Sequence, residues 1–179
     1  MIRLLIICQL SSIIFGQKIF DEFEKGRHNN YHSKETFRFD TVPDDGSYTI
    51  LLENVEGSIE VRTHAGAGAE ITITRKIRAR TEKKAKRLVK DAKILVYHLE
   101  DDQLIQVRSE KKIRYKRGVH TKFELKLPMN INLNLKTAGG DIDVTDIRGE
   151  SVLKTSGGDL DLENLMGRIE AHTSGGDID

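Results

Sequence analysis

The fold is decided by Thr137-Ala-Gly-Gly-Asp-Ile-Asp-Val144, because this pattern returns twice later in the chain. It recurs as Thr155-Ser-Gly-Gly-Asp-Leu-Asp-Leu162 and then as Thr173-Ser-Gly-Gly-Asp-Ile-Asp179, so the three copies begin at equal intervals along the sequence. A fixed period of this kind indicates a repeat architecture in which each unit packs against its neighbours.

Each repeat unit predicts two short strands joined by glycine turns. Ile142 and Val144 alternate with Asp141 and Asp143, which is the period-two pattern of a strand with one buried face. The glycine pair before each first aspartate favours a turn. Because a two-strand unit cannot bury its apolar face alone, we expect residues 137–179 to form a parallel β-helix-like β-solenoid with 18-residue rungs.

The third repeat stops at Asp179, in the middle of a predicted strand. An uncapped rung leaves apolar surface and an unpaired strand edge. We therefore expect the chain to be truncated and the natural protein to continue with more rungs. A short solenoid capped by dimerisation is the alternative.

Stacking in register predicts ladders of aspartates, since neighbouring strands lie about 4.8 Å apart. Like charges that face each other across strands are destabilising. A bound cation offsets this repulsion, and calcium prefers several oxygen ligands. The candidate calcium ladder consists of Asp141, Asp143, Asp159 and Asp161. The alternative is a solvated acidic face without a metal, and no other cofactor is expected.

Residues 1–16 predict a secretory signal peptide. Arg3 precedes a mostly apolar run from Leu4 to Phe15, and Gly16 offers a small residue at the cleavage point. The run is about half the roughly 20 residues that a membrane-spanning helix needs. A core strand or an uncleaved anchor is the alternative. Cleavage would remove Cys8, the single cysteine, and leave an exported chain without thiols.

The region before the repeats divides into two parts. Residues 17–35 are polar and predict a flexible leader, whereas residues 36–136 predict a β-rich region with one helix over residues 82–92. Within this region, residues 54–61 (Asn-Val-Glu-Gly-Ser-Ile-Glu-Val) match residues 164–171 of the repeats almost position for position. We therefore expect the early region to belong to the same structural system.

The charge is distributed unevenly. Residues 17–136 carry 25 Lys and Arg against 18 Asp and Glu, and residues 137–179 carry 3 against 10. The basic stretch Lys111–Arg117 contains one aromatic, which makes a poor stacking platform for nucleic acid. No nucleic-acid partner is expected. A solvated strand and loop is the simplest interpretation, and peripheral contact with an anionic membrane or cell-wall polymer is the functional alternative.

The motifs exclude the common enzyme classes. The chain has no phosphate-binding loop, no dinucleotide-binding glycine pattern and no Ser/His/Asp grouping. Paired carboxylates hydrolyse glycosides in some β-helices. Here the aspartates repeat identically in every rung, which fits a scaffold better than a unique site. We expect no enzymatic activity.

The sequence resembles a family of bacterial envelope proteins that carry the label adhesin on a domain of unknown function. The resemblance covers roughly residues 36–179 and rests on residues 54–61, on Phe123-Glu-Leu-Lys-Leu-Pro128 and on the Gly-Gly-Asp repeats. It implies a non-enzymatic, exported, adhesin-like protein of the periplasm, cell surface or extracellular space. Its partner would be a surface or envelope polymer or protein. An envelope-stress sensor and a carbohydrate-active β-helix are the alternatives.

Overall fold

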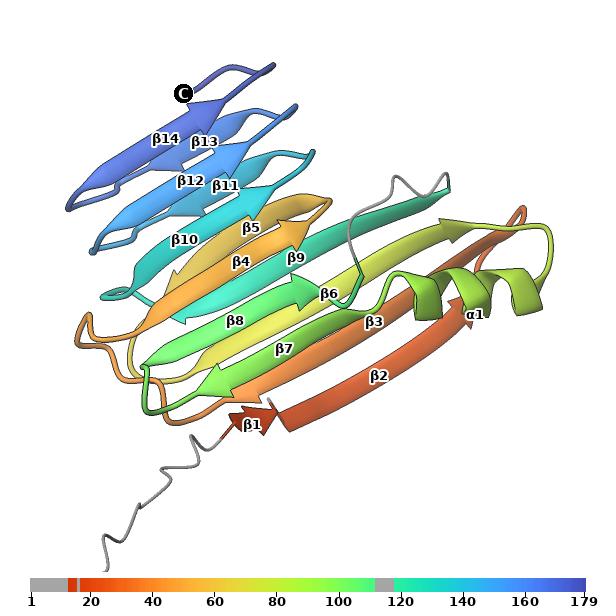
Figure 1. Cartoon of the computed structure of the whole chain (residues 1–179), viewed down its shortest axis with the longest axis horizontal. Coiled ribbons are helices and arrows are strands. Elements are labelled where there is room, and N and C mark those ends of the chain that lie inside the picture. Colours follow the sequence, from red (N-terminus) through yellow and green to blue (C-terminus); the bar gives the residue numbers. More distant parts are fainter. Residues whose placement is uncertain (1–12, 16, 112–117) are drawn as a thin grey trace, which may run out of the picture.

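The protein, seen in a computed structural model, is mainly β over the residues that the structure describes, 13–15, 17–111 and 118–179 (Figure 1). Strands account for 59% of the chain, and one helix accompanies them in this part. The prediction of a mainly β chain with one helix is therefore confirmed.

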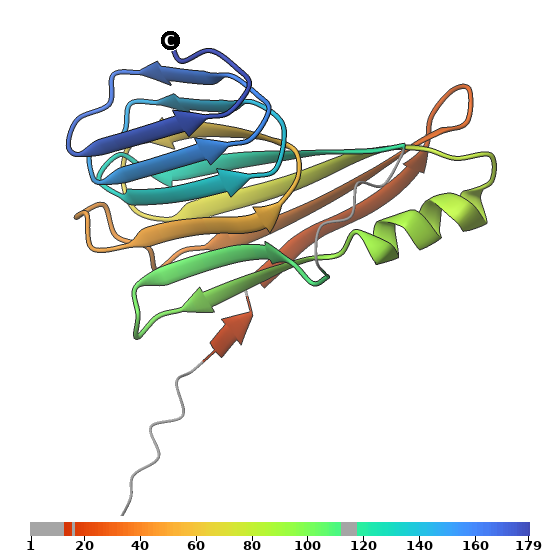
Figure 2. The same cartoon turned by 45° about the horizontal axis from the view of Figure 1, so that its top comes forward.

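Two seven-stranded sheets pack face to face within the described ranges (Figure 1 and Figure 2). Sheet A contains, in spatial order, β1 (Ile13–Phe15), β7 (Ile94–Leu99), β8 (Leu104–Ser109), β4 (Thr49–Val55), β10 (Asn132–Thr137), β12 (Ser151–Thr155) and β14 (Ile169–Thr173). Sheet B contains β13 (Leu160–Glu163), β11 (Ile142–Thr145), β5 (Ser58–His64), β9 (Val119–Pro128), β6 (Ala69–Arg78), β3 (Asn30–Phe39) and β2 (Gln17–Lys25).

The core lies between the two sheets because alternate residues of each strand point inward. In β10, Leu133 and Leu135 are buried while Asn134 and Lys136 lie on the other face. Facing strands of sheet B contribute equivalent rows of isoleucine, valine and leucine to the same apolar cluster. Each side chain buried in this way contributes about 1.5–3 kcal/mol relative to an exposed one.

The repeat region pairs in parallel with a constant offset of one repeat. Leu133 of β10 lies beside Ser151 of β12, and Ile142 of β11 lies beside Leu160 of β13. The chain alternates between the sheets, with one strand of each repeat in sheet A and the next in sheet B. Residues 54–61 join this stack, since Ile59 of β5 pairs in parallel with Ile142.

Both sheets are nevertheless mixed. β7 and β8 form an antiparallel hairpin in sheet A, and β9, β6, β3 and β2 run antiparallel to one another in sheet B. The parallel pairs therefore occupy one side of the molecule only, and a β-solenoid does not describe the chain as a whole.

Contacts between the rungs explain why each one carries the pattern Thr-x-Gly-Gly-Asp. The Thr155 hydroxyl donates to the carbonyl oxygen of Gly140 in the preceding rung, at 2.9 Å. The first glycine, Gly157, faces open space, whereas a Cβ on Gly158 would overlap the carbonyl oxygen of Gly140. The Asp159 carboxylate accepts the backbone N–H of Asp177 in the following rung. The second glycine is thus required for close stacking of the rungs.

The prediction of a flexible leader over residues 17–35 differs from the structure. These residues form β2 and the first half of β3, which pair as an antiparallel hairpin at the edge of sheet B. Polar side chains suit an edge hairpin because one of its faces meets water. The apolar residues that face inward are few and widely spaced, so the alternation is weak in the sequence.

The helix α1 (Glu82–Asp91) lies within the predicted range 82–92. The Thr81 side chain caps its first turn by accepting the N–H of Lys84. Ala85 is fully buried against Tyr31 and Ile77 in a small second core beside sheet B. The helix thereby covers the ends of β3 and β6 (Figure 1).

The predicted signal peptide falls mostly on residues 1–12 and 16, which lie outside the described residues. Ile13–Phe15 form β1, which pairs antiparallel with β7. No helix in the described ranges has the length and apolar character needed to cross a membrane.

Candidate functional site

The outer face of sheet B carries a continuous row of carboxylates, here called the acidic row. Asp161, Asp143, Glu60 and Glu124 are direct neighbours across β13, β11, β5 and β9. Their strands lie about 4.8 Å apart, and like charges at this spacing repel one another. Cations on the same face must offset this repulsion.

Arg62 of β5 holds the centre of the acidic row. Its guanidinium donates two hydrogen bonds to the Asp143 carboxylate, each at 2.9 Å, and a third to the Thr145 hydroxyl at 2.6 Å. Its Nε lies 3.1 Å from Oε1 of Glu60. A bidentate arginine–carboxylate pair fixes geometry as well as charge. Because Arg62 is 48% exposed, this pair orients the side chains more than it stabilises the fold.

Lys122 of β9 approaches the acidic row from the other side. Its Nζ lies 2.5 Å from Glu60 and 3.1 Å from Glu124. The hydrogen bond from Lys122, with further help from Arg62, lowers the pKa of Glu60. The same contacts with Glu60 and Glu124 raise the pKa of Lys122. Glu60 and Lys122 therefore remain charged at neutral pH.

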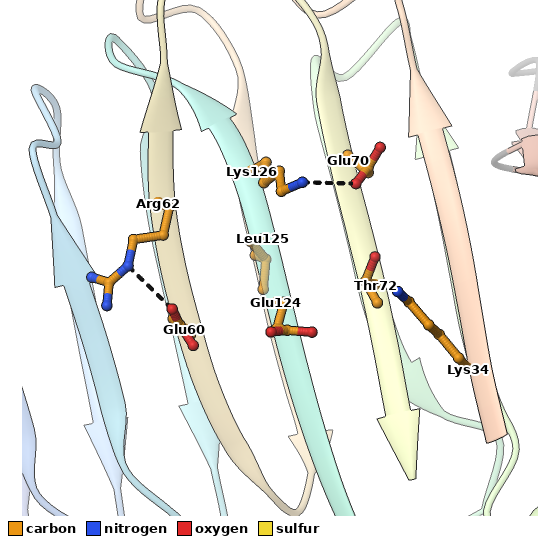
Figure 3. Close-up of a pocket in the computed structure, with 8 residues that line it drawn as sticks. All are labelled: Lys34, Glu60, Arg62, Glu70, Thr72, Glu124, Leu125 and Lys126. Carbon is orange, nitrogen blue, oxygen red and sulfur yellow. Dashed lines mark ion pairs between the residues drawn. The ribbon is translucent and has the colours of Figure 1, made fainter. Parts of the chain in front are cut away.

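A shallow hollow of about 250 Å³ lies beside the acidic row (Figure 3). The sheet-B residues that line it are Lys34, Glu60, Arg62, Glu70, Thr72, Glu124, Leu125 and Lys126. Figure 3 shows Lys126 directed toward Glu70, and Lys34 extending toward Thr72. The hollow is lined by both acidic and basic side chains, which suits a polar ligand that lies across the strands.

Glu70 on β6 is paired twice at the rim of this hollow. Its carboxylate lies 3.1 Å from the Arg38 guanidinium and 3.5 Å from Nζ of Lys126. Burial opposes ionisation of Glu70, but Arg38 and Lys126 outweigh it, and the pKa of Glu70 is lowered. Glu60 and Glu70 are thus ionised at neutral pH, and neither is poised to donate a proton.

The structure separates the four predicted aspartates into two sets. Asp141 and Asp159 lie at the turns, and each accepts the backbone N–H of the equivalent aspartate in the next rung, at 3.1 and 2.9 Å. Asp143 and Asp161 belong to the acidic row, with Asp143 bound to Arg62 and Asp161 exposed. Backbone and arginine donors therefore contact three of the four carboxylates that the calcium ladder requires.

Among residues 13–15, 17–111 and 118–179, no group of three or more His, Cys, Asp or Glu side chains is arranged to hold a metal ion. The calcium ladder stays a prediction. The predicted basic stretch Lys111–Arg117 lies outside the described residues except for Lys111, whose Nζ is 3.9 Å from Asp91.

The sequence did not single out Glu60, Glu124, Arg62 and Lys122 as parts of the site. Alternation in residues 58–61 was enough to place Glu60 on the outer face of a strand. Its position beside Asp143, far later in the chain, follows from the parallel pairing of β5 with β11. The match of residues 54–61 to the repeats indicated that β5 belongs to the stack, but it did not show which repeat strand lies beside it.

No family model matches the chain, and no curated protein matches it. Among solved structures, the chain is similar to one described as a "putative cell adhesion protein" from Clostridium sporogenes. The two share 8% sequence identity with a TM-score of 0.45, over 78% of this chain and 68% of that one. A likeness at this level assigns this chain neither a family nor a function.

Proposed function

We propose that this chain is a non-enzymatic, adhesin-like binding or scaffolding protein of the bacterial envelope, and that its parallel strand pairs are rungs of a β-solenoid. The observation that carries the proposal is the in-register stacking of equivalent strands from successive repeats, which repeats equivalent side chains at regular intervals on the outer face. Side chains on such a face keep fixed spacings, as recognition of an extended partner requires.

The chemistry of the outer face of sheet B supports binding over catalysis. The pKa values of Glu60 and Glu70 are lowered and that of Lys122 is raised, so these groups carry fixed charge at neutral pH. General acids and bases are effective when their pKa lies near the working pH. Fixed charges of both signs favour a polar or zwitterionic surface polymer or protein as the partner, with no cofactor.

An envelope location rests on the signal-peptide pattern of residues 1–16 and on the resemblance of the repeats to envelope proteins. Export through this segment places the chain in the periplasm, on the cell surface or outside the cell. A proposal of contact with anionic membranes rests on the basic stretch Lys111–Arg117 and is separate from the face of sheet B.

A matched pair of lysine variants tests the proposed face. Lys126→Gln changes an exposed lysine beside the hollow, and Lys136→Gln changes an exposed lysine on the outer face of sheet A. We expect Lys126→Gln to weaken binding to purified peptidoglycan sacculi several-fold at low salt, and less at high salt. Lys136→Gln is expected to bind like the parent protein. Equal binding by both variants would place any contact elsewhere.

One observation favours a second candidate, a carbohydrate-active enzyme. The unlike residues Asp143, Arg62 and Lys122 gather on one face, as they do not in a purely repetitive scaffold. Incubation with acidic polysaccharides, followed by measurement of reducing ends and unsaturated products, distinguishes the two functions. Turnover that Glu60→Gln abolishes would replace the binding proposal with an enzymatic one.

A further inference from the structure

The inner face of β6 carries one arginine among apolar side chains. Arg75 follows Ile73, which belongs to the main core, and precedes Ile77, which belongs to the small second core beside α1. Alternate residues of a strand share one face, so Arg75 lies between the two cores. It is fully buried. Because a buried charge is costly unless hydrogen bonds satisfy it, each donor of this guanidinium needs a partner.

A chain of ion pairs fixes the orientation of this guanidinium. Its Nη1 lies 2.5 Å from Oε2 of Glu35 on β3, and Oε1 of Glu35 lies 2.7 Å from Nζ of Lys18 on β2. Burial opposes ionisation of Glu35, but Arg75 and Lys18 outweigh it, and the pKa of Glu35 is lowered. Both carboxylate oxygens are therefore used. Because a guanidinium is planar, the bond at Nη1 leaves the Nε–Nη2 edge turned away from Glu35.

That edge consists of donors without acceptors. Among the residues that the structure describes, nothing accepts a hydrogen bond from Nε or Nη2 of Arg75, and both atoms are buried. The buried hydroxyl of Ser33 also lacks a partner in this part of the chain, and Ser33 lies directly opposite Arg75 on β3. Opposite residues have Cβ atoms about 4.5–5.5 Å apart on the same face of a sheet. Such unpaired buried groups call for a bound ion or water.

We propose that the Nε–Nη2 edge of Arg75 and the hydroxyl of Ser33 bind one small carboxylate-type oxyanion, of the class of formate, acetate and bicarbonate, as a structural ion. The two N–H groups of this edge are parallel and match the two oxygens of a carboxylate. The charge agrees with an anion, since Arg75 and Lys18 face the one carboxylate of Glu35. Asp21 also pairs with Lys18, but its side chain is 66% exposed and water screens it.

The depth of the site limits the size of the ion. The Arg75 side chain is 1% exposed, so a polymer or a large ligand cannot reach it. Glu35 and Lys18, at 19% and 36% exposure, lead from the guanidinium to the edge strand β2. Strands with few buried contacts open locally at a lower free energy than core strands, so a small ion can exchange along this route. The site does not depend on the charged outer face of sheet B.

Thermal unfolding of the full chain, dialysed into carboxylate-free buffer, tests the proposal. Sodium formate is titrated to about 0.2 M against sodium chloride at equal ionic strength. We expect formate to raise the melting temperature by roughly 3–6 °C at ten times its dissociation constant, because it binds only the folded state. Chloride has no pair of oxygens to meet both N–H groups and should raise it less. Equal effects of the two salts, or no rise with formate, overturn the proposal.

Two serine variants form a matched pair. Ser33→Ala removes a proposed ligand, and Ser151→Ala removes a buried hydroxyl of sheet A that also lacks a partner among the described residues. Without formate, both variants should melt at or above the temperature of the parent, because each loses an unsatisfied polar group. Ser33→Ala should raise the formate dissociation constant about tenfold or more, and Ser151→Ala should leave it unchanged. Equal constants for the two variants would contradict a site at Ser33.

A spectroscopic measurement locates the ion at Arg75. In proton–nitrogen correlation spectra, the Nε–H signal of Arg75 should move downfield with added formate and stop at saturation, because a hydrogen bond to an oxyanion deshields the proton. The double variant Glu35→Gln/Arg75→Met removes the guanidinium together with its partner and identifies this signal. It should melt at the same temperature in formate and in chloride. A formate effect that persists in this variant, or an Nε–H signal that stays in place, overturns the proposal.

Discussion

Substitution of Gly140 by alanine tests whether close stacking of the rungs holds the fold together. Gly140 sits directly on Gly57, and a Cβ added to it would lie 2.5 Å from the carbonyl carbon of Gly57 and 2.6 Å from the backbone nitrogen of Ser58. The strands would have to separate by about 1 Å to reach ordinary van der Waals contact. That movement would stretch the hydrogen bond from the Ile59 N–H to the Asp141 oxygen, now 2.8 Å.

The expected cost follows from two effects. Overpacking in a close-packed interior costs about 1–3 kcal/mol. Gly140 also has a φ of 108°, which an alanine adopts only with strain of about 1–3 kcal/mol. A gain of about 0.4–1 kcal/mol from the stiffer unfolded chain partly offsets both. We expect Gly140→Ala to lower the free energy of unfolding by about 2–4 kcal/mol, with a melting temperature lower by roughly 5–12 °C.

The neighbouring glycine is the matched control. A Cβ on Gly139 meets nothing within 4 Å, so Gly139→Ala is expected to be neutral or to stabilise by up to about 1 kcal/mol. Urea unfolding followed by circular dichroism measures both variants, and equal slopes in denaturant show that the same transition is compared. If the two variants unfold within about 0.5 kcal/mol of each other, stacking of the second glycine does not stabilise the fold as argued.

Four further predictions concern buried polar groups and calcium. Thr155→Val removes the donor to the Gly140 oxygen and should destabilise the protein by about 1 kcal/mol in urea unfolding. Glu35→Gln removes the carboxylate 2.5 Å from the buried Arg75 and should cost about 3–5 kcal/mol, most of which the double variant with Arg75→Met should recover. Burial lowers the pKa of His98 below 6.5, although the charge of Glu100 opposes this shift. The free energy of unfolding is therefore highest above pH 6.5 and falls as the pH drops below that value, and His98→Asn should weaken this pH dependence in urea unfolding. Calcium should leave the melting temperature unchanged, because other donors contact most of the ladder carboxylates; a clear rise would establish a calcium site.

The predicted repeat unit and the observed contacts agree at the level of single residues. The alternation of Ile142 and Val144 with two aspartates was enough to predict which side chains enter the core. The sequence also showed that the glycine pair matters, although only the contacts distinguish Gly139, which faces open space, from Gly140, which cannot carry a side chain. Local periodicity reports the buried face of a strand, and it does not report the distance to the next strand.

The candidate site was less accessible to prediction. The sequence identified the aspartate ladder but not the cations that neutralise it, because Arg62 and Lys122 come from strands that are distant in the chain. The polar residues 17–35 were predicted to be a flexible leader, yet they pair as β2 and β3 because edge strands need little apolar surface.

The strand-rich composition, the 18-residue period and the inward or outward direction of the repeat side chains could be predicted from the sequence, since these depend on neighbours along the chain. The order of the strands in the two sheets became clear from the three-dimensional structure. In sheet A, β4 lies between β8 and β10, and in sheet B, β5 lies between β9 and β11, so segments that are far apart in the sequence become neighbours. The match of residues 54–61 to the repeats predicted that this segment joins the stack, but the order of the strands depends on how the apolar faces of whole strands fit together in one core.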